Sequence, residues 1–187
     1  MMIRQFWFGP TVVAAALLAL TGCAQSGQVA QVSSAPPVAT ASPTPTQNPD
    51  QAATTQILAV YAGMRQAQAA AEAAGSMQNV SLGSYAAGSA FDAIVTAVGQ
   101  DAGNGWRMVG APVLDPKVTA LALNAQPPTA TITDCMNVAG WHTVDQFTGK
   151  DITAPSTHSS FVSVSQAQLG QNGWRITETE VNRSMPC

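Results

Sequence analysis

The sequence has few charged side chains. Asp, Glu, Lys and Arg together make up 9% of its 187 residues, well below the roughly 25% that is usual in soluble domains. Seven basic and ten acidic residues give a net charge of −3, and the basic residues form no cluster. Proteins that bind nucleic acid or an anionic membrane surface through side chains use such clusters. We therefore expect no nucleic-acid partner.

Residue types that commonly act in catalysis or bind metals are also scarce. The chain has two histidines, His142 and His158, and three cysteines, and none of them has the short spacing of a zinc site. The sequence contains no G-x-S-x-G nucleophile turn. Because His142 follows Trp141 in a predicted strand, the two side chains should point to opposite faces. We expect both histidines at the surface, and a protein with no metal, no cofactor and no enzymatic activity.

No apolar run near the N-terminus is long enough to span a membrane. Residues 11–20 are apolar, whereas a transmembrane helix needs about 20 such residues. Arg4 precedes this run, and Leu20-Thr21-Gly22-Cys23 ends it, an order that is typical of a secretory signal peptide. The alternative is a buried N-terminal helix. It fits less well, because Pro10 would interrupt the helix and a polar, proline-rich segment follows it.

The last four residues of this segment resemble the lipobox of bacterial lipoproteins. In those proteins the cysteine is lipidated and becomes the first residue of the mature chain. The resemblance implies that residues 1–22 are a signal peptide and that Cys23 carries acyl chains such as palmitate. Two or more chains anchor a protein stably in a bilayer. We therefore expect a cell-membrane protein, lipid-anchored on the extracytoplasmic face. Residues 23–50 would be its Pro-, Ser- and Thr-rich linker and residues 51–187 its globular domain.

Two cysteines remain once Cys23 is assigned to the lipid. Outside the cytoplasm, Cys135 and Cys187 are expected to form a disulfide rather than to stay as free thiols. Such a bridge would close a loop of some fifty residues and stabilise the fold by roughly 4 kcal/mol in the chain-entropy model. The alternative is a buried thiol at Cys135 and a reactive thiol at Cys187.

Helical spacing occurs only in the first part of the predicted domain. Apolar residues recur at three- and four-residue intervals after Asp50, a suitable N-cap, and an alanine-rich stretch continues to Ala74 before Gly75. A second helix is predicted over residues 82–98, and Gly99 together with residues 101–105 is expected to end it. After residue 105 the apolar spacing changes to two, which is typical of strands. The expected strands are residues 118–123, 129–136, 141–147, 159–169 and 174–181.

The order of these elements predicts the fold class. Two helices followed by a run of strands indicate an α+β domain. Gln171-Asn172-Gly173 is the strongest hairpin signal, and the last strand should place Trp174 and Ile176 on one face. We expect the two N-terminal helices to pack on a curved antiparallel sheet of four to six strands.

Several short motifs lie along the predicted sheet. They are Thr131-Ile132-Thr133-Asp134-Cys135, then Trp141 with Asp145 and Thr148-Gly149 after it, Gly173-Trp174-Arg175-Ile176, and the terminal Cys187. Together they resemble small secreted proteins and lipoproteins of actinobacteria with the cone-shaped NTF2-like fold. The resemblance covers about residues 55–187. It implies the cone arrangement and a Cys135–Cys187 pairing, and it implies no catalytic set.

These observations favour a non-catalytic accessory or interaction module of the cell envelope, with an envelope protein as its partner. A second possibility is a binding protein for a small apolar ligand, which would use the cone as a cup. Aromatic residues could line that pocket, although each is also typical of a core. The candidates are Tyr61, Tyr85, Phe91, Trp106, Trp141, Phe161 and Trp174.

A third and weaker possibility is an enzyme of the dehydratase or isomerase type. Such an enzyme needs a buried carboxylate or histidine in the pocket as its general base. The candidates on the predicted elements are Asp92 and Tyr85, Tyr61 and Asp134. The alternative places the tyrosines in the core, Asp92 on the polar side of its helix, and Asp134 in hydrogen bonds near the disulfide.

Overall fold

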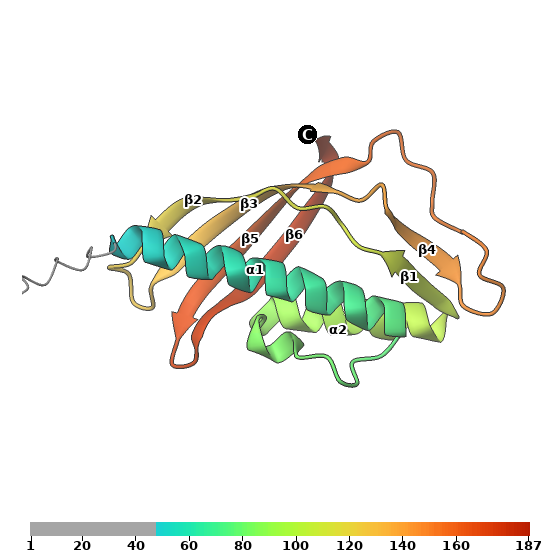
Figure 1. Cartoon of the computed structure of the whole chain (residues 1–187), viewed down its shortest axis with the longest axis horizontal. Coiled ribbons are helices and arrows are strands. Elements are labelled where there is room, and N and C mark those ends of the chain that lie inside the picture. The colour runs from blue at the N-terminus through green and yellow to red at the C-terminus, as the bar shows by residue number, and fades with distance from the viewer. Residues whose placement is uncertain (1–47) are drawn as a thin grey trace, which may run out of the picture. The chain divides into compact units, whose positions relative to one another are not determined.

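The computed structural model of the chain describes residues 48–187. The predicted signal peptide, Cys23 and the linker up to residue 47 lie outside the described residues. Among those described, no helix is long and apolar enough to cross a membrane. Two helices precede six strands (Figure 1), and the helices pack against antiparallel sheets. The predicted α+β class is therefore confirmed.

Helix α1 (Pro49–Ala74) has the expected length. It is capped by Asn48, whose side-chain oxygen accepts a hydrogen bond of 3.0 Å from the backbone N–H of Asp50. The prediction of Asp50 as the cap is wrong, because Asp50 lies inside the first turn, where its charge complements the helix dipole. Gly75 ends the helix with φ of 60°, a left-handed conformation that favours glycine.

The second predicted helix is wrong at both ends, because it begins later than residue 82 and continues past Gly99. Residues Leu82–Ser84 form a short 3-10 turn (η1), and α2 spans Gly88–Gly103. Between them the backbone pairs with a strand: the Ile176 N–H donates to the Tyr85 carbonyl at 2.8 Å, and the Ala87 N–H donates to the Ile176 carbonyl at 2.9 Å. Backbone groups that are paired in this way cannot also make helical hydrogen bonds, so α2 begins later than the apolar spacing suggests.

The strands form two antiparallel sheets, of which the larger has the order β2-β3-β5-β6 and the smaller pairs β1 with β4. The strand bounds are β1 (Trp106–Gly110), β2 (Pro116–Ala122), β3 (Thr129–Asn137), β4 (Trp141–Asp145), β5 (Ser160–Gly170) and β6 (Gly173–Pro186). The predicted hairpin joins β5 to β6, with Gly170 opposite Gly173. Strand β1 is absent from the sequence prediction.

Strand β4 is shorter than predicted because a turn follows it directly. One carboxylate oxygen of Asp145 accepts hydrogen bonds from the backbone N–H groups of Phe147 (3.1 Å) and Thr148 (2.8 Å). Hydrogen bonds from Thr148 also lower the pKa of Asp145. This local capping takes the backbone out of the strand at Asp145.

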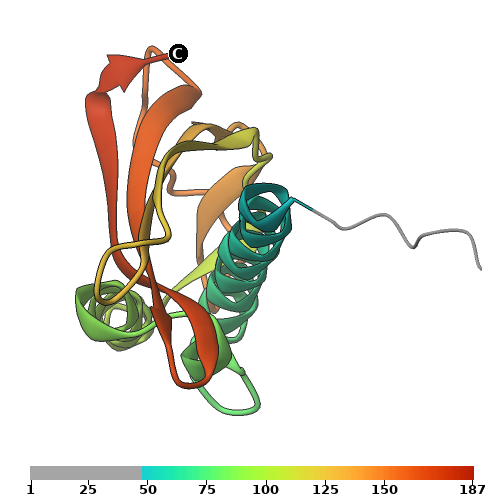
Figure 2. The same ribbon diagram turned by 90° about the vertical axis from the view of Figure 1, so that its left-hand side faces the viewer.

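The core lies between the helices and one face of the larger sheet. Helix α1 crosses that face (Figure 1), and both α1 and α2 contact β6 of the larger sheet (Figure 2). The buried apolar residues of this core include Ile57, Tyr61, Met64, Leu82, Ala90, Ile94, Val98, Ile132, Ala167, Trp174 and Ile176. Full burial of one large apolar side chain contributes about 1.5–3 kcal/mol, so this cluster holds the helices on the sheet.

The inward face of the larger sheet is polar along part of its length. On β5, Ser163 and Ser165 are buried, whereas Val164 between them is 39% exposed. Asp134 on β3 is also buried. Buried polar groups are costly without hydrogen bonds, so this polar strip requires partners from the helix that covers it.

A disulfide joins Cys135 to Cys187, with 5.9 Å between their Cα atoms. Cys135 lies on β3, and Cys187 follows β6. Since β5 lies between β3 and β6, the bridge spans a strand of the larger sheet and fastens the C-terminal end of the chain.

We expect the double variant Cys135→Ser/Cys187→Ser to have a free energy of unfolding lower by about 4 kcal/mol, because the bridge closes a loop across a separation of 52 residues. Urea denaturation of the oxidised protein and the variant measures the difference. A reducing agent should lower the stability of the wild-type protein by a similar amount and leave the variant unchanged. Equal stabilities of the oxidised protein and the variant would contradict this account.

Candidate ligand-binding site

A buried arginine provides the partners that the polar strip of the sheet requires. Arg65 lies on α1 and is 3% exposed. Its Nε donates to the Tyr61 hydroxyl at 3.1 Å, and one Nη donates to Gln68 at 3.0 Å. The other Nη donates to the hydroxyls of Ser163 (2.8 Å) and Thr179 (2.9 Å). These hydrogen bonds to a charged donor offset the cost of burying the guanidinium.

Tyr61 links this guanidinium to a buried carboxylate. Its hydroxyl donates to Asp134 Oδ2 at 2.8 Å, and Asp134 Oδ1 accepts from the Asp115 backbone N–H at 2.7 Å. Burial raises the pKa of Tyr61, although the nearby charge of Arg65 opposes the increase. The network therefore holds opposite charges on either side of one phenol and ties α1 to strands β3, β5 and β6.

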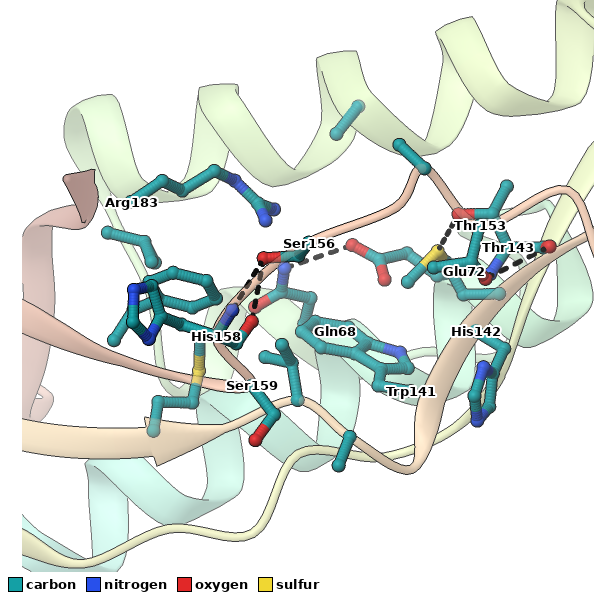
Figure 3. Close-up of a pocket in the computed structure, with 18 of the residues that line it drawn as sticks. Gln68, Glu72, Trp141, His142, Thr143, Thr153, Ser156, His158, Ser159 and Arg183 are labelled. Carbon is teal, nitrogen blue, oxygen red and sulfur yellow. Dashed lines mark hydrogen bonds between the residues drawn. The ribbon is translucent and has the colours of Figure 1, made fainter. Parts of the chain in front are cut away.

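A cavity of about 810 Å³ lies beside this network. Both helices, several strands and the segment after β4 contribute to its wall (Figure 3). The lining residues are Arg65, Gln68, Glu72, Ala97, Asp101, Met108, Met136, Val138, Ala139, Trp141, His142, Thr143, Thr153, Ala154, Pro155, Ser156, His158, Ser159, Phe161, Val181 and Arg183.

One wall of the cavity holds a buried carboxyl group, that of Glu72 on α1, which is 5% exposed. Its Oε1 accepts a hydrogen bond of 2.9 Å from Gln68, whereas Oε2 has no hydrogen-bond partner among the described residues. Burial raises the pKa of Glu72 from 4.5 to about 7, and the nearby charge of Asp101 adds to the increase. Near neutral pH, Glu72 therefore exists in both its ionised and its neutral form.

A second buried polar atom without a partner belongs to the same wall. Trp141, at the start of β4, is 9% exposed, and its indole Nε1–H makes no hydrogen bond to the described residues. Leaving such an atom unpaired costs about 1–3 kcal/mol, and unpaired buried groups in a native fold call for an explanation. The residues that line the cavity thus include one unpaired donor, at Trp141, and one unpaired carboxylate oxygen, at Glu72, and both atoms have almost no exposed surface.

The rim of the cavity carries the two histidines. His142 Nδ1 lies 3.2 Å from Asp151 Oδ2, and hydrogen bonds from Thr153 lower the pKa of Asp151. His158 lies on the segment after β4, where the Ser156 hydroxyl donates to its backbone carbonyl at 2.7 Å. The expectation of surface histidines holds in part: both are at least partly exposed, and both contribute to the rim.

Arg183 extends over the cavity from β6. Its guanidinium lies 5.8 Å from the centre of the Phe161 ring, in a cation–π arrangement. Figure 3 shows Arg183 and His158 on one side of the cavity and Glu72 further across it. Another basic residue of the wall, Arg65, lies on α1 with Glu72, and its guanidinium donates to Tyr61, Gln68, Ser163 and Thr179.

Comparisons with known proteins identify the fold and no family. No protein-family model matches this chain, and no curated protein matches it. A solved structure does. The domain is similar to the crystal structure of the intermembrane space region of the chloroplast protein ARC6, with a TM-score of 0.51 and 13% sequence identity, over 73% of this chain and 98% of that chain. At this level of identity the similarity concerns the fold alone.

The structure separates the aromatic residues that the sequence proposed for a pocket. Trp141 and Phe161 line the cavity. The others lie elsewhere: Tyr61 and Trp174 are buried in the core, Tyr85 and Phe91 pack against it, and Trp106 is 39% exposed. The cavity wall also carries more charged groups than the apolar cup expected from these aromatic residues.

The residues considered for catalysis do not meet in the cavity. Asp92 is exposed on α2. The Tyr61 hydroxyl donates a hydrogen bond to Asp134. Asp134, Tyr61 and Tyr85 are not part of the cavity wall. No group of three or more His, Cys, Asp or Glu side chains within residues 48–187 is arranged to hold a metal ion.

Sequence reasoning missed the polar residues of α1 that reach the site. Arg65, Gln68 and Glu72 follow Tyr61 at intervals of four, three and four residues, so they continue the helix face that Ile57 and Tyr61 bury. Polar residues that continue the buried face of an alanine-rich helix are the pattern that could have identified them.

The ionisation of Glu72 should make stability depend on pH. The folded state raises the pKa of this carboxyl to about 7, so between its ordinary value and about 7 the folded state binds more protons than the unfolded state. Stability therefore falls as the pH rises through this range, by about 3 kcal/mol for this group alone. We expect Glu72→Gln to remove that decrease, as measured by urea denaturation from about pH 4 to pH 8.

The matched control for this experiment is Glu178→Gln, a change at an exposed glutamate of β6. The control should follow the wild-type protein at every pH. Parallel curves for the wild-type protein and Glu72→Gln would show that Glu72 titrates as it does in the unfolded chain, contrary to our account.

Proposed function

We propose that this protein is an extracytoplasmic bacterial lipoprotein whose domain binds a small molecule in the cavity described above. One observation carries the proposal: a cavity of about 810 Å³ with unpaired polar atoms of Glu72 and Trp141 in its wall. Binding sites for drug-sized ligands have volumes of about 300–1,000 Å³ and combine an apolar lining with a few polar groups. The domain would act as a non-catalytic accessory component of the cell envelope.

The free-energy cost of the unpaired polar atoms in the cavity wall supports a role for the cavity itself. A domain that acted only through its outer surface would need neither an internal space nor unpaired buried groups. Each such group lowers the stability of the empty domain by about 1–3 kcal/mol. A ligand that forms hydrogen bonds with these groups recovers this free energy, which therefore contributes to the affinity of the ligand.

The lipobox-like segment Leu20–Cys23 supports the proposed location. A diacylglyceryl group on Cys23 would attach the chain to the membrane. An accessory role beside an envelope protein remains compatible with ligand binding, because a bound molecule can be passed to a partner or can change the domain's affinity for one.

We expect Cys23→Ser to move the protein from the membrane fraction to the soluble extracytoplasmic fraction, because a serine cannot carry the thioether-linked lipid. Fractionation of the producing bacteria followed by immunoblotting measures this. Cys135→Ser is the control, since it should leave the protein with the membrane. Recovery of the Cys23→Ser protein in the membrane fraction would contradict the proposed anchor.

Filling the cavity tests the binding function. Ala97 on α2 lines the cavity, whereas Ala93 on the same helix is exposed and does not. Native mass spectrometry of the protein purified from its host should show a co-purified small molecule. We expect Ala97→Trp to lose this molecule, because the indole occupies its space, and Ala93→Trp to keep it.

Ala139 also lines the cavity, and Ala139→Trp provides a second filling variant in case Ala97→Trp does not fold. Retention of the ligand by a folded filling variant would show that binding occurs elsewhere on the protein. The proposed function would then be wrong.

A further inference from the structure

The charges around the cavity are opposite in sign and are not paired with each other. Glu72 and Asp101 contribute carboxyl groups from α1 and α2, and Arg183 contributes a guanidinium from β6. The guanidinium of Arg65 also belongs to the wall and its charge acts on Glu72, but it already donates to Tyr61, Gln68, Ser163 and Thr179. The ion pairs among residues 48–187 are Lys117–Asp115 and His142–Asp151. Glu72 and Arg183 therefore face one cavity without closing an ion pair across it (Figure 3).

The acidic side is suited to a positively charged donor. Glu72 is nine-tenths buried and has a free carboxylate oxygen, and it is close enough to Asp101 for the two charges to interact. An ammonium group has three donors and a positive charge, so it can pair with the free oxygen and relieve the repulsion. Oε2 has almost no exposed surface, so the carboxyl group must turn towards the cavity to receive such a donor.

The basic side is suited to an anion. Arg183 is exposed and has no carboxylate partner among the described residues, and its guanidinium is held over the Phe161 ring. A guanidinium in a fixed orientation binds a carboxylate through two parallel hydrogen bonds. The side chain of His158 lies on the same side of the cavity.

The wall of the cavity also has a hydrogen-bond donor and an apolar surface. The Trp141 indole N–H lacks an acceptor and, like Glu72 Oε2, has almost no exposed surface, so the ring must turn to present it to a ligand. Met136 and Phe161 add apolar surface. A peptide carbonyl is an acceptor of the kind that the indole N–H lacks.

We propose that the cavity binds an elongated zwitterion, namely a short peptide with a free amino end and a free carboxyl end. The ammonium group lies at Glu72 and Asp101, the carboxylate lies at Arg183 and His158, and a peptide carbonyl accepts from Trp141. This inference rests on the proposed function, because it names the class of ligand for the same cavity.

The test uses the full chain and three tripeptides: tri-alanine, N-acetyl-tri-alanine and tri-alanine amide. NMR titration at about pH 8, where Glu72 is ionised, measures each dissociation constant at up to millimolar peptide. We expect saturable binding of tri-alanine, and binding that is weaker by about tenfold or more when either end is blocked. Equal affinity for all three peptides, or no binding of tri-alanine, would overturn the inference.

Two variants assign each end of the peptide to its side of the cavity. Glu72→Gln should bind tri-alanine and N-acetyl-tri-alanine equally and still discriminate against the amide. Arg183→Gln should bind tri-alanine and its amide equally and still discriminate against the acetylated peptide. A merely structural effect would weaken all three peptides together, and that result also counts against the inference.

Matched controls come from charged residues of β6 outside the cavity wall. Glu178→Gln and Arg175→Gln change the same residue types and should bind all three peptides as the wild-type protein does. If tri-alanine fails to bind while a co-purified ligand is lost from Ala97→Trp, the peptide class is wrong and the binding function stands. If Ala97→Trp retains that ligand, the binding function itself is wrong.

Discussion

The arrangement of this domain depends on one buried guanidinium. Arg65 lies where α1 crosses the larger sheet. Two of its four hydrogen bonds join α1 to strands β5 and β6, and the other two go to Tyr61 and Gln68 of α1 itself. Through Tyr61 it also stabilises Asp134 on β3. Loss of any one of these partners would leave a buried charge or dipole unsatisfied. The register of the helix on the sheet is therefore restricted by hydrogen-bond geometry as well as by apolar contact.

The same helix face extends from this network into the cavity. Gln68 accepts from Arg65 and donates to Glu72, so each polar side chain orients the next. The chain of hydrogen bonds ends at Glu72 Oε2, which has no further partner in the described part of the protein. Arg65, which joins the helix to the sheet, and Glu72, which has an unpaired oxygen, thus belong to one continuous row of side chains on α1.

Much of the fold follows from patterns within single segments. The spacing of Ile57, Tyr61 and Met64 and the hairpin at residues 171–173 depend on neighbouring residues, and the structure confirms both. The start of α2 depends on pairing with Ile176, almost ninety residues later, which no local pattern reveals. In the sequence, serines such as Ser163 suggest the solvent-exposed face of a strand. In the structure Ser163 is on the inward face, because its hydroxyl accepts a hydrogen bond from Arg65. The sequence analysis considered a pocket and named two of its lining residues, Trp141 and Phe161, but it missed the polar wall, because that wall is assembled from segments distant in sequence.

The disulfide has a consequence for the order in which the cavity is completed. In the register of β6 with β5, Asn182 pairs with Val162 and Pro186 pairs with Phe161, so Arg183 lies in an irregular segment between these two attachments. Cys187, immediately after Pro186, fastens the far end of that segment to β3. In a newly made chain whose thiols are still reduced, the segment lacks this covalent attachment. Oxidation of the two thiols therefore adds the last covalent restraint on the segment that positions the guanidinium.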